Sequence, residues 1–537
     1  MAQIEIKDLT FFYPDMEKGG YLENPALKDI SLGIERGEFV LLCGKTGCGK
    51  STFLKSLKPS IRPKGRYEGC VLFQNMELDY LTEREQVEKI GFVMQNPDNQ
   101  IVTDKVWHEL AFGLENLGYR SEEIRLRTAE IAEYFEIMDL YFMDTDKLSG
   151  GQKQLLNLAA VLIMNPDVLI LDEPTSQLDP IAAEKFVGSL KKINEDFGIT
   201  IILSEHRVSS VMDIADKVIV MDDGKIIRYG DTKEVVAHIQ DEDLGKLMPI
   251  PTRIFEKCYT EYSGDIPISI KQGREWIAEK IVQNIKIQTI VEDSGNLNIR
   301  KNERAICCQN VWYRYEKREE DIVKGLNFTV KKGEIFAILG GNGTGKTTTM
   351  WLLSGVKKPY RGKIHMNGKV ALLPQNVQNL FYRDSVGEEL EGADKQLIRK
   401  MGLNSLQKRH PYDISGGQQQ KVAIAKVLME NPDILLLDEP TKAIDGIYKE
   451  ELGKLLVDLK NQGKTIIIVS HDLDFCGEYA DRCGLFANGS LIAVNCCREF
   501  FAGNRFYTTT VSKMAGRMIE GAVKMEDVVC YMKSIIH

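Results

Sequence analysis

The sequence predicts an α/β fold that is built twice along one chain of 537 residues. Three stretches recur in the same order: GKTGCGKS at 44–51 and GGNGTGKT at 340–347, LSGGQKQ at 148–154 and ISGGQQQ at 414–420, and VLILDEPT at 168–175 and ILLLDEPT at 434–441. The spacing also repeats, because 23 positions separate Ser149 from Asp172 and Ser415 from Asp438. Such an internal repeat indicates two homologous domains.

The repeats set the predicted domain bounds. The first domain covers 1–240, a connector covers 241–301, and the second domain covers 302–537 with an accessory segment from about residue 500. The second copy is trimmed between its glycine loop and its SGGQ stretch, where 69 positions replace the 99 of the first copy. Proline and glycine interrupt the apolar groups of the connector, which predicts partial order with one short helix.

Composition limits the functional classes. The formal net charge of −9 gives no general attraction for a phosphate backbone, so we expect no nucleic-acid partner. No apolar run approaches the ~18 residues of a membrane span, and the N-terminus shows no secretory pattern. The eleven cysteines form no CxxC pair and are expected to be reduced, mostly buried thiols. A cytosolic chain is predicted, and any membrane role must come through a partner.

Each glycine loop follows an apolar strand and opens onto a helix, the context of a phosphate-binding loop. Its backbone N–H groups can face an anion, Lys50 or Lys346 supplies a fixed charge, and Ser51 or Thr347 offers a hydroxyl to Mg²⁺. The expected phosphate-binding residues are Gly44, Lys45, Thr46, Gly47, Cys48, Gly49, Lys50, Ser51 and Thr52 in the first copy, and Gly340, Gly341, Asn342, Gly343, Thr344, Gly345, Lys346, Thr347 and Thr348 in the second.

Two acids follow the apolar run of VLILDEPT, which is typical of a buried strand in a parallel sheet. The acids should emerge at the carboxyl edge, where α/β proteins bind ligands. Since adjacent side chains on a strand point in opposite directions, the two acids should differ in role. Asp172 is assigned to Mg²⁺ and Glu173 to activating the attacking water as general base; Asp438 and Glu439 repeat these assignments.

Histidine and tyrosine recur at matching places. His206 and His471 each end another apolar strand, 34 and 33 positions after the metal-binding acids. A satisfied structural histidine is the ordinary interpretation, but the repeated offset favours a sensor of the terminal phosphate. Tyr13 and Tyr315 precede the glycine loops and could stack on a nucleotide base; a core or surface tyrosine is the alternative.

The SGGQ stretches open a second helix in each copy, and a serine with glycines at a helix N-terminus makes another anion-binding surface. This helix cannot easily reach the glycine loop of its own domain. We therefore expect the two domains to pair head to tail, each SGGQ completing the other site, with two nucleotides between them. The residues concerned are Ser149, Gly150, Gly151, Gln152, Ser415, Gly416, Gly417 and Gln418.

With these motifs the sequence resembles ABC ATPases that carry two nucleotide-binding domains in one polypeptide. The resemblance implies two tandem P-loop NTPase domains, each with a mostly parallel core sheet, an antiparallel β subdomain and a helical signature subdomain. It further implies ATP and Mg²⁺ as ligands and ATP hydrolysis as activity. Gln95 and Gln375 become Q-loop residues near Mg²⁺ and water, so the implied metal set is Ser51, Gln95, Asp172, Thr347, Gln375 and Asp438.

The resemblance also gives Asp179 and Asp445 as D-loop residues that touch across the paired domains. The second D-loop differs from the usual small-residue pattern because it carries Lys442. Strict symmetry between the two sites is therefore not expected. Both copies retain the acid pair and the histidine, so neither site is expected to be inactive.

The segment MQNPDNQIVTDKVWHELAFGLENLG at 94–118 resembles the Q-loop region of ATPases from energy-coupling factor (ECF) transporters. This resemblance implies import of a vitamin, metal ion or related small molecule. The implied partners are a multi-span transmembrane coupling protein and a substrate-binding membrane component, with the ATPase at the cytoplasmic face of the cell membrane. Trp107, Leu110 and Phe112 are expected to offer apolar surface to a partner helix.

Two other classes compete with an importer. A soluble tandem ABC ATPase that acts on ribosomes should carry a long, charged helical linker, whereas this connector is rich in β-branched residues and broken by glycine and proline. A DNA-repair ATPase needs a long coiled coil between glycine loop and signature, which does not fit in the 99 positions from Lys50 to Ser149. The sequence favours the importer.

Overall fold

A computed structural model describes residues 2–15, 19–206, 208–239, 242–259, 265–284, 304–442 and 444–536. The chain forms two compact units, Met1–Met248 and Pro249–His537. Residues 241, 260–264 and 285–301 of the predicted connector lie outside the described part. The predicted domain bounds stay a prediction.

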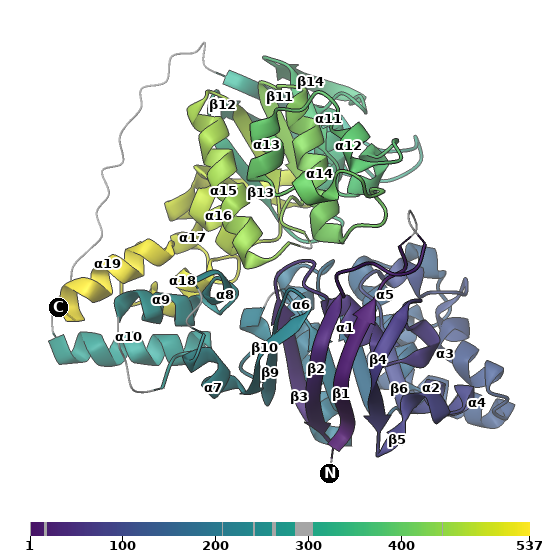
Figure 1. Ribbon diagram of the computed structural model, residues 1–537. Coiled ribbons are helices and arrows are strands. Elements are labelled where there is room, and N and C mark those ends of the chain that lie inside the picture. Colours follow the sequence, from purple (N-terminus) through teal and green to yellow (C-terminus); the bar gives the residue numbers. More distant parts are fainter. Residues whose placement is uncertain are drawn as a thin grey trace. The chain divides into compact units, whose positions relative to one another are not determined.

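The core of unit 1 is a six-stranded sheet in which only the pair β9–β10 is antiparallel (Figure 1). Its order is β10 (Lys225–Asp231), β9 (Lys217–Asp222), β3 (Phe39–Gly44), β8 (Thr200–Ser204), β7 (Val168–Asp172) and β6 (Ile90–Val93). Every residue of β3, β7 and β8 is buried, as expected for strands covered on both faces. The parallel register pairs Asp172 with Ser204, so these two strands end side by side.

A second, antiparallel sheet covers the core of unit 1. Its order is β2 (Leu27–Glu35), β1 (Ala2–Phe12), β4 (Arg66–Phe73) and β5 (Met76–Glu77). Ile4, Ile6 and Phe11 from this sheet pack in one cluster with Val40 and Phe53 of the core. The helices of unit 1 are α1 (Lys50–Ser56), α2 (Glu83–Lys89), α3 (Val106–Asn116), α4 (Ser121–Tyr134), α5 (Gly150–Leu162), α6 (Pro180–Phe197), α7 (Thr232–Ala237) and α8 (Glu242–Gly245).

Unit 2 repeats this plan. Its core sheet has the order β15 (Val370–Leu373), β16 (Ile434–Asp438), β17 (Thr465–Val469), β13 (Ile335–Leu339), β18 (Arg482–Ala487) and β19 (Ser490–Cys496). The antiparallel sheet has the order β12 (Val323–Lys331), β11 (Arg304–Tyr313) and β14 (Arg361–Met366). Two tandem α/β domains with a mostly parallel sheet and an antiparallel sheet confirm the predicted fold class. The head-to-tail pairing of the domains stays a prediction.

The helices of unit 2 show where the second copy is trimmed. They are α9 (Ile250–Cys258), α10 (Ile270–Asn284), α11 (Lys346–Leu353), α12 (Val386–Glu389), α13 (Lys395–Lys400), α14 (Gly416–Met429), α15 (Gly446–Asn461), α16 (Leu473–Tyr479), α17 (Cys497–Gly503), α18 (Thr510–Ala515) and α19 (Met525–Ile536). The 14 residues of α4 correspond to only 6 in α13. Three residues link β14 to β15, which leaves no room for counterparts of β5 and α2.

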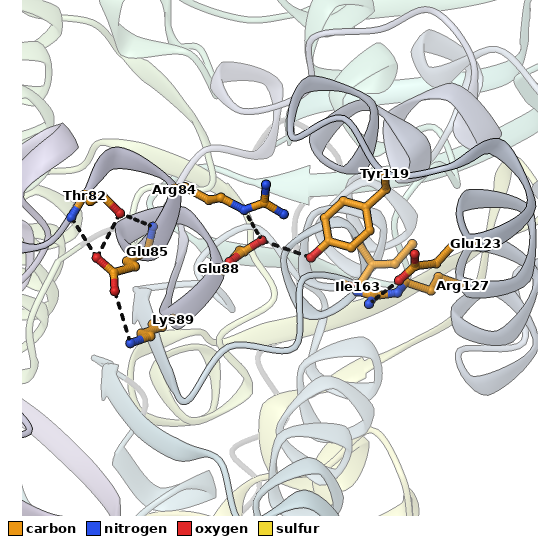
Figure 2. Close-up of polar contacts among 9 residues, drawn as sticks. All are labelled: Thr82, Arg84, Glu85, Glu88, Lys89, Tyr119, Glu123, Arg127 and Ile163. Carbon is orange, nitrogen blue, oxygen red and sulfur yellow. Dashed lines mark hydrogen bonds and ion pairs between the residues drawn. The ribbon is translucent and has the colours of Figure 1, made fainter.

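In unit 1, α2 is tied by polar contacts to the helices that follow the Q-loop, as Figure 2 shows. The carboxylate of Glu88 accepts hydrogen bonds from Arg84 Nε and from the Tyr119 hydroxyl, both at 2.9 Å. The Arg127 guanidinium lies 4.7 Å from the centre of the Tyr119 ring and donates to the Ile163 carbonyl at 3.3 Å. These contacts join α2, which directly precedes β6, to the turn before α4, to α4 and to the end of α5.

Helices from the predicted connector pack against the C-terminal helices of the same unit (Figure 1). Phe255 and Trp276 of α9 and α10 share a cluster with Met514 of α18 and Met532 of α19. The connector therefore contains more helix than the single short one that the sequence predicts. The helical pattern of the connector is weak in the sequence because its apolar residues pack against a segment more than 200 positions away.

Within the described part of the chain, no helix is both long and apolar enough to cross a membrane.

Candidate nucleotide sites

The two glycine loops have the same backbone shape. Gly44 has φ 155° and Gly340 has φ 151°. A Cβ atom at either position would lie 2.2 Å from a backbone carbonyl oxygen, that of Met221 or of Phe486. The loop therefore turns tightly against the neighbouring strand, and only glycine fits there.

The loop lysines are buried and directed into their own loops. Lys50 Nζ donates to the carbonyl oxygens of Gly44 and Lys45 at 2.9 and 3.1 Å. Lys346 Nζ donates to those of Gly340 and Gly341 at 2.9 and 2.7 Å. An ammonium held by loop carbonyls is placed where the loop N–H groups converge, which suits the binding of a terminal phosphate.

A hydroxyl and a carboxylate meet at the start of each loop helix. Burial raises the pKa of Asp172, the charge of Glu173 raises it further, and hydrogen bonds from Ser51 and Ser204 lower it. Burial raises the pKa of Asp438 to about 6, against the lowering effect of a hydrogen bond from Thr347.

Oxygen donors of this kind suit Mg²⁺. The Oδ1 atom of Asp438 is buried and makes no hydrogen bond with the described residues. A carboxylate oxygen without a partner beside a hydroxyl fits the binding of a divalent cation, because the ion would satisfy that oxygen.

In unit 1 the second acid of the pair, Glu173, contacts two other predicted site residues. Gln95 Nε2 donates to Glu173 Oε2 at 2.7 Å, and His206 Nε2 lies 2.7 Å from Glu173 Oε1. Both His206 and Glu173 are nearly buried, with side chains 11% and 10% exposed. The three residues predicted from separate motifs thus come together at one carboxylate.

In unit 2 the same acid has different neighbours. His471 Nε2 lies 3.3 Å from Glu439 Oε1, and the His471 backbone N–H donates to Glu439 Oε2 at 3.2 Å. Gln375 is exposed, and within the described residues it makes no hydrogen bond with Glu439. The structure brings the acid and the histidine together but leaves this glutamine apart.

The paired acids were predicted to differ in role because adjacent side chains of one strand point in opposite directions, and this reason is wrong. Strands β7 and β16 end at Asp172 and Asp438, and the next residues leave the extended conformation. Glu173 has φ 46° and Glu439 has φ 54°, in the left-handed region that glutamate rarely adopts. The acids face different directions because the backbone turns between them. Strained backbone of this kind is often found at functional sites.

The signature serines cap helices. Ser149 accepts a hydrogen bond from the Gln152 backbone, and the Gln152 side chain accepts one from the Ser149 backbone. Ser415 and Gln418 form the same reciprocal pair at the start of α14. The two glycines after each serine form the first turn of the helix, so the helix N-terminus is open to an anion.

The D-loop acids and the two tyrosines also lie at matching places. Asp179 caps α6 through a hydrogen bond from the Ala182 backbone, and Asp445 caps α15 in the same way. The hydroxyl of Tyr13 bonds to Thr52 at 2.9 Å, and that of Tyr315 to Thr348 at 3.1 Å. Each tyrosine is therefore fixed against the helix that follows its glycine loop, with part of the ring exposed.

Sequence reasoning missed a serine next to each acid pair. Ser204 Oγ donates to Asp172 Oδ1 at 2.8 Å and accepts from the Glu173 backbone N–H at 3.0 Å. In unit 2, Ser470 Oγ lies 3.1 Å from Thr441 Oγ1. The available signal was a serine two positions before His206, in LSEH, and one position before His471, in VSH.

The predicted partner surface after the Q-loop is corrected in one respect. Leu110 is fully buried and packs into unit 1, so it offers no surface. The periodicity of α3 did not distinguish its inward face from its outward face. Trp107 is 38% exposed and stacks on His108, so the outward face of α3 does carry an aromatic ring.

A glycine loop between strand and helix, with an acid pair at the end of another parallel strand of the same sheet, defines a P-loop nucleotide-binding protein, and here the arrangement occurs twice. The profile of one family, described as ABC transporter, matches residues 27–176 and 323–442. The chain belongs to the ABC transporter family as an ATP-binding protein with two ABC domains. Membership of this family implies binding and hydrolysis of ATP.

Similar proteins span the whole chain. A Bacillus anthracis protein, provisionally described as an ABC transporter ATP-binding protein, is 37% identical over 98% of both chains. A structure titled as a model of ribosome-bound archaeal Pelota and ABCE1 covers 92% of this chain and 80% of its own, with a TM-score of 0.63 and 20% identity, and supports the fold alone. CbiO1 of Clostridium perfringens, titled as part of the ABC transporter complex CbiONQ, covers 44% of this chain and 91% of its own at 35% identity, with a TM-score of 0.39.

Proposed function

We propose that this chain is the ATP-hydrolysing subunit of an importer of the ECF type, in which both nucleotide sites are active. The observation that carries the hydrolytic part is the meeting of glutamate and histidine at each site, Glu173 with His206 and Glu439 with His471. The segment 94–118 supports the importer part, because its residues resemble the Q-loop region of that class.

The proposed role of each residue follows from its contacts. Lys50 and the loop N–H groups would bind the outer phosphates, and Ser51 and Asp172 would hold Mg²⁺. Lys346, Thr347 and Asp438 would do the same in unit 2. Mg²⁺ would neutralise charge that develops on the transferred phosphoryl group.

Hydrolysis needs a base for the attacking water. Glu173 takes a proton from that water as its oxygen bonds to the terminal phosphorus, and the bond from phosphorus to the bridging oxygen of ADP breaks. His206 fixes one carboxylate oxygen of Glu173, and Gln95 holds the other until water reaches it. In unit 2 the corresponding residues are Glu439 and His471, with Gln375 entering only when nucleotide draws in the Q-loop.

Pairing of the two ABC domains head to tail would let Ser149 and Ser415 complete the opposite sites, with Asp179 and Asp445 near the contact. ATP binding would favour the closed pair and hydrolysis would release it. A change from 1:99 to 99:1 in such an equilibrium requires about 5.5 kcal/mol of differential binding. Two ATP molecules held between the domains could supply it.

The proposed partners are a multi-span transmembrane coupling protein and a substrate-binding membrane component, with this chain at the cytoplasmic face of the cell membrane. Trp107 is the proposed contact, since its ring is exposed on the helix that follows the Q-loop. The imported molecule would be a vitamin, a metal ion or a related small molecule that this chain itself does not contact.

The test is copurification of the tagged full chain from detergent-solubilised native membranes. A multi-span membrane protein is expected in the complex, and Trp107→Glu is expected to reduce its recovery. Ile227→Glu is the matched control, because Ile227 is 41% exposed on β10, at the opposite edge of the sheet from β6. Recovery of ribosomes alone would contradict the importer and favour a soluble ATPase that acts on ribosomes.

A further inference from the structure

One position next to the acid pair carries different chemistry in the two units. DEPTSQLD at 172–179 aligns with DEPTKAID at 438–445, so Ser176 corresponds to Lys442. The backbone N–H of Ser176 donates to the Glu173 carbonyl at 3.2 Å, and that of Lys442 donates to the Glu439 carbonyl at 3.1 Å. The same turn therefore directs both side chains from the same place beside the acids.

Neither side chain finds a partner in its own unit. The Ser176 hydroxyl oxygen is buried and makes no hydrogen bond with any described residue. Lys442 is half-buried, and within the described part of the chain its ammonium makes no hydrogen bond and no ion pair. A polar group withdrawn from water without a partner costs free energy, and a buried charge costs more. Two such groups at one position indicate that a ligand supplies the partner.

The surroundings of Lys442 show what that ligand is. Its charge acts on Asp438 and Glu439, and Asp438 also feels the charge of Lys346. Burial lowers the pKa of Lys442, while the two carboxylates raise it. The Lys442 ammonium is therefore near the acid pair and, like Lys346, acts through its charge on Asp438. In the proposed function the terminal phosphate binds beside this acid pair. Lys346 and Mg²⁺ do not use all of its negatively charged oxygens, so a further cation can contact it.

We propose that Lys442 is a further substrate-contacting residue of the unit 2 site, which donates to the terminal phosphate of ATP and to the inorganic phosphate formed from it. This proposal rests on the proposed function of the site. Ser176 makes the corresponding contact in unit 1 as a neutral hydroxyl donor. The unit 2 site therefore holds a fixed cation that the unit 1 site lacks, and it binds the dianionic terminal phosphate of ATP more strongly and with greater dependence on salt.

The experiment uses the full chain with one site silenced. In a Glu173→Gln background, hydrolysis reports unit 2, and Lys442→Met, Lys442→Ser and Lys442→Arg are compared at low and high potassium chloride. Loss of one charge-assisted bond should raise the MgATP concentration for half-maximal hydrolysis about tenfold or more in the Met and Ser variants. Loss of this bond should also weaken the salt dependence of the half-maximal MgATP concentration and the inhibition of hydrolysis by inorganic phosphate. Lys442→Arg should restore both.

The reciprocal variant is Ser176→Lys in a Glu439→Gln background, where the half-maximal MgATP concentration should fall and become more sensitive to salt. Salt dependence separates a charge contact from a packing role, since Met keeps most of the lysine stem.

Equal half-maximal concentrations and equal salt profiles for Lys442→Met and its parent would overturn the proposal. A loss that Lys442→Arg shares in full would do the same, because it would show a role for shape and not for charge. If the Glu→Gln backgrounds themselves keep full turnover, the proposed function of the acids fails instead, so the two failures are distinguishable.

Discussion

In unit 1 the carboxylate of Glu173 is held by Gln95 and His206, whereas in unit 2 Glu439 is held by His471 while Gln375 lies on the surface. The backbone that carries the acids is nearly the same in both, down to the left-handed residue after the strand. The two units also differ in the segment that leads into the Q-loop. In unit 1, Glu88 of α2 contacts Tyr119 in the turn before α4, and Arg127 of α4 contacts the end of α5 (Figure 2). In unit 2, three residues join β14 to β15. Repeats can therefore share a scaffold and still place one predicted site residue differently.

The largest expected effect comes from removing both acids. Glu173→Gln with Glu439→Gln should lower ATP hydrolysis by about 10² to 10⁴, the usual contribution of a general base. Each single substitution should lower hydrolysis by the share that its own site contributes, so comparing the two single variants shows which site turns over faster. Phosphate release measures the effect, with retained ATP binding as control. Unchanged turnover in both single variants would contradict the assignment.

A pH-dependent difference in stability should follow from Asp438. Burial raises its pKa to about 6 from the ordinary value of 3.8, so folding favours the protonated form. Its stabilising contribution is complete below pH 3.8 and is lost as the pH rises through 6. At pH 8 the buried charge costs about 2 to 3 kcal/mol without nucleotide or metal.

Asp438→Asn should accordingly raise the thermal midpoint of unit 2 at pH 8 in EDTA by several degrees, and by about half as much at pH 5. Asp172→Asn should act in the same direction in unit 1, because burial also raises the pKa of Asp172. Thermal unfolding followed by circular dichroism measures both. A larger increase of the thermal midpoint at pH 5 than at pH 8 would show that the charge of the buried carboxylate does not destabilise the fold.

The glutamines should separate the two sites. Gln95→Ala, measured with unit 2 silenced by Glu439→Gln, should lower hydrolysis about tenfold, since a hydrogen bond to a carboxylate is lost. Gln375→Ala, measured with unit 1 silenced by Glu173→Gln, should lower it by about threefold or less, because that contact is not preformed. Equal losses would mean that nucleotide erases the difference between the units.

The smallest expected effect concerns the signature caps. Ser149→Ala and Ser415→Ala should each cost about 1 kcal/mol of unfolding free energy. Asp394→Ala is a matched control, because Asp394 caps α13 through the Gln396 backbone at 2.9 Å. If the signature serines also contact ATP, the Ser149→Ala and Ser415→Ala variants should hydrolyse ATP more slowly, whereas the Asp394→Ala control should not. Equal hydrolysis in all three variants would restrict the serines to helix capping.

Much of the site could be predicted because its motifs are local. The glycine loop, the capping serine and the acid after an apolar strand each act through backbone geometry within a few residues, and each repeats. The contact of Gln95 with Glu173 spans 78 positions, and neither residue carries a pattern that fixes the distance between them. Ser204 was missed for the same reason, because its contact with Asp172 spans 32 positions and follows from the pairing of two strands.

By itself the sequence determined two α/β domains, the strands that carry the acids, and the side chains at each P-loop, since burial and turn chemistry are encoded over short stretches. Only the tertiary structure decided the rest. It placed Leu110 inside and Trp107 outside, packed connector helices against a C-terminal segment, and held Gln95 but not Gln375 at its glutamate. These outcomes depend on contacts between residues far apart in the chain, where the packing of each partner sets the geometry of the other.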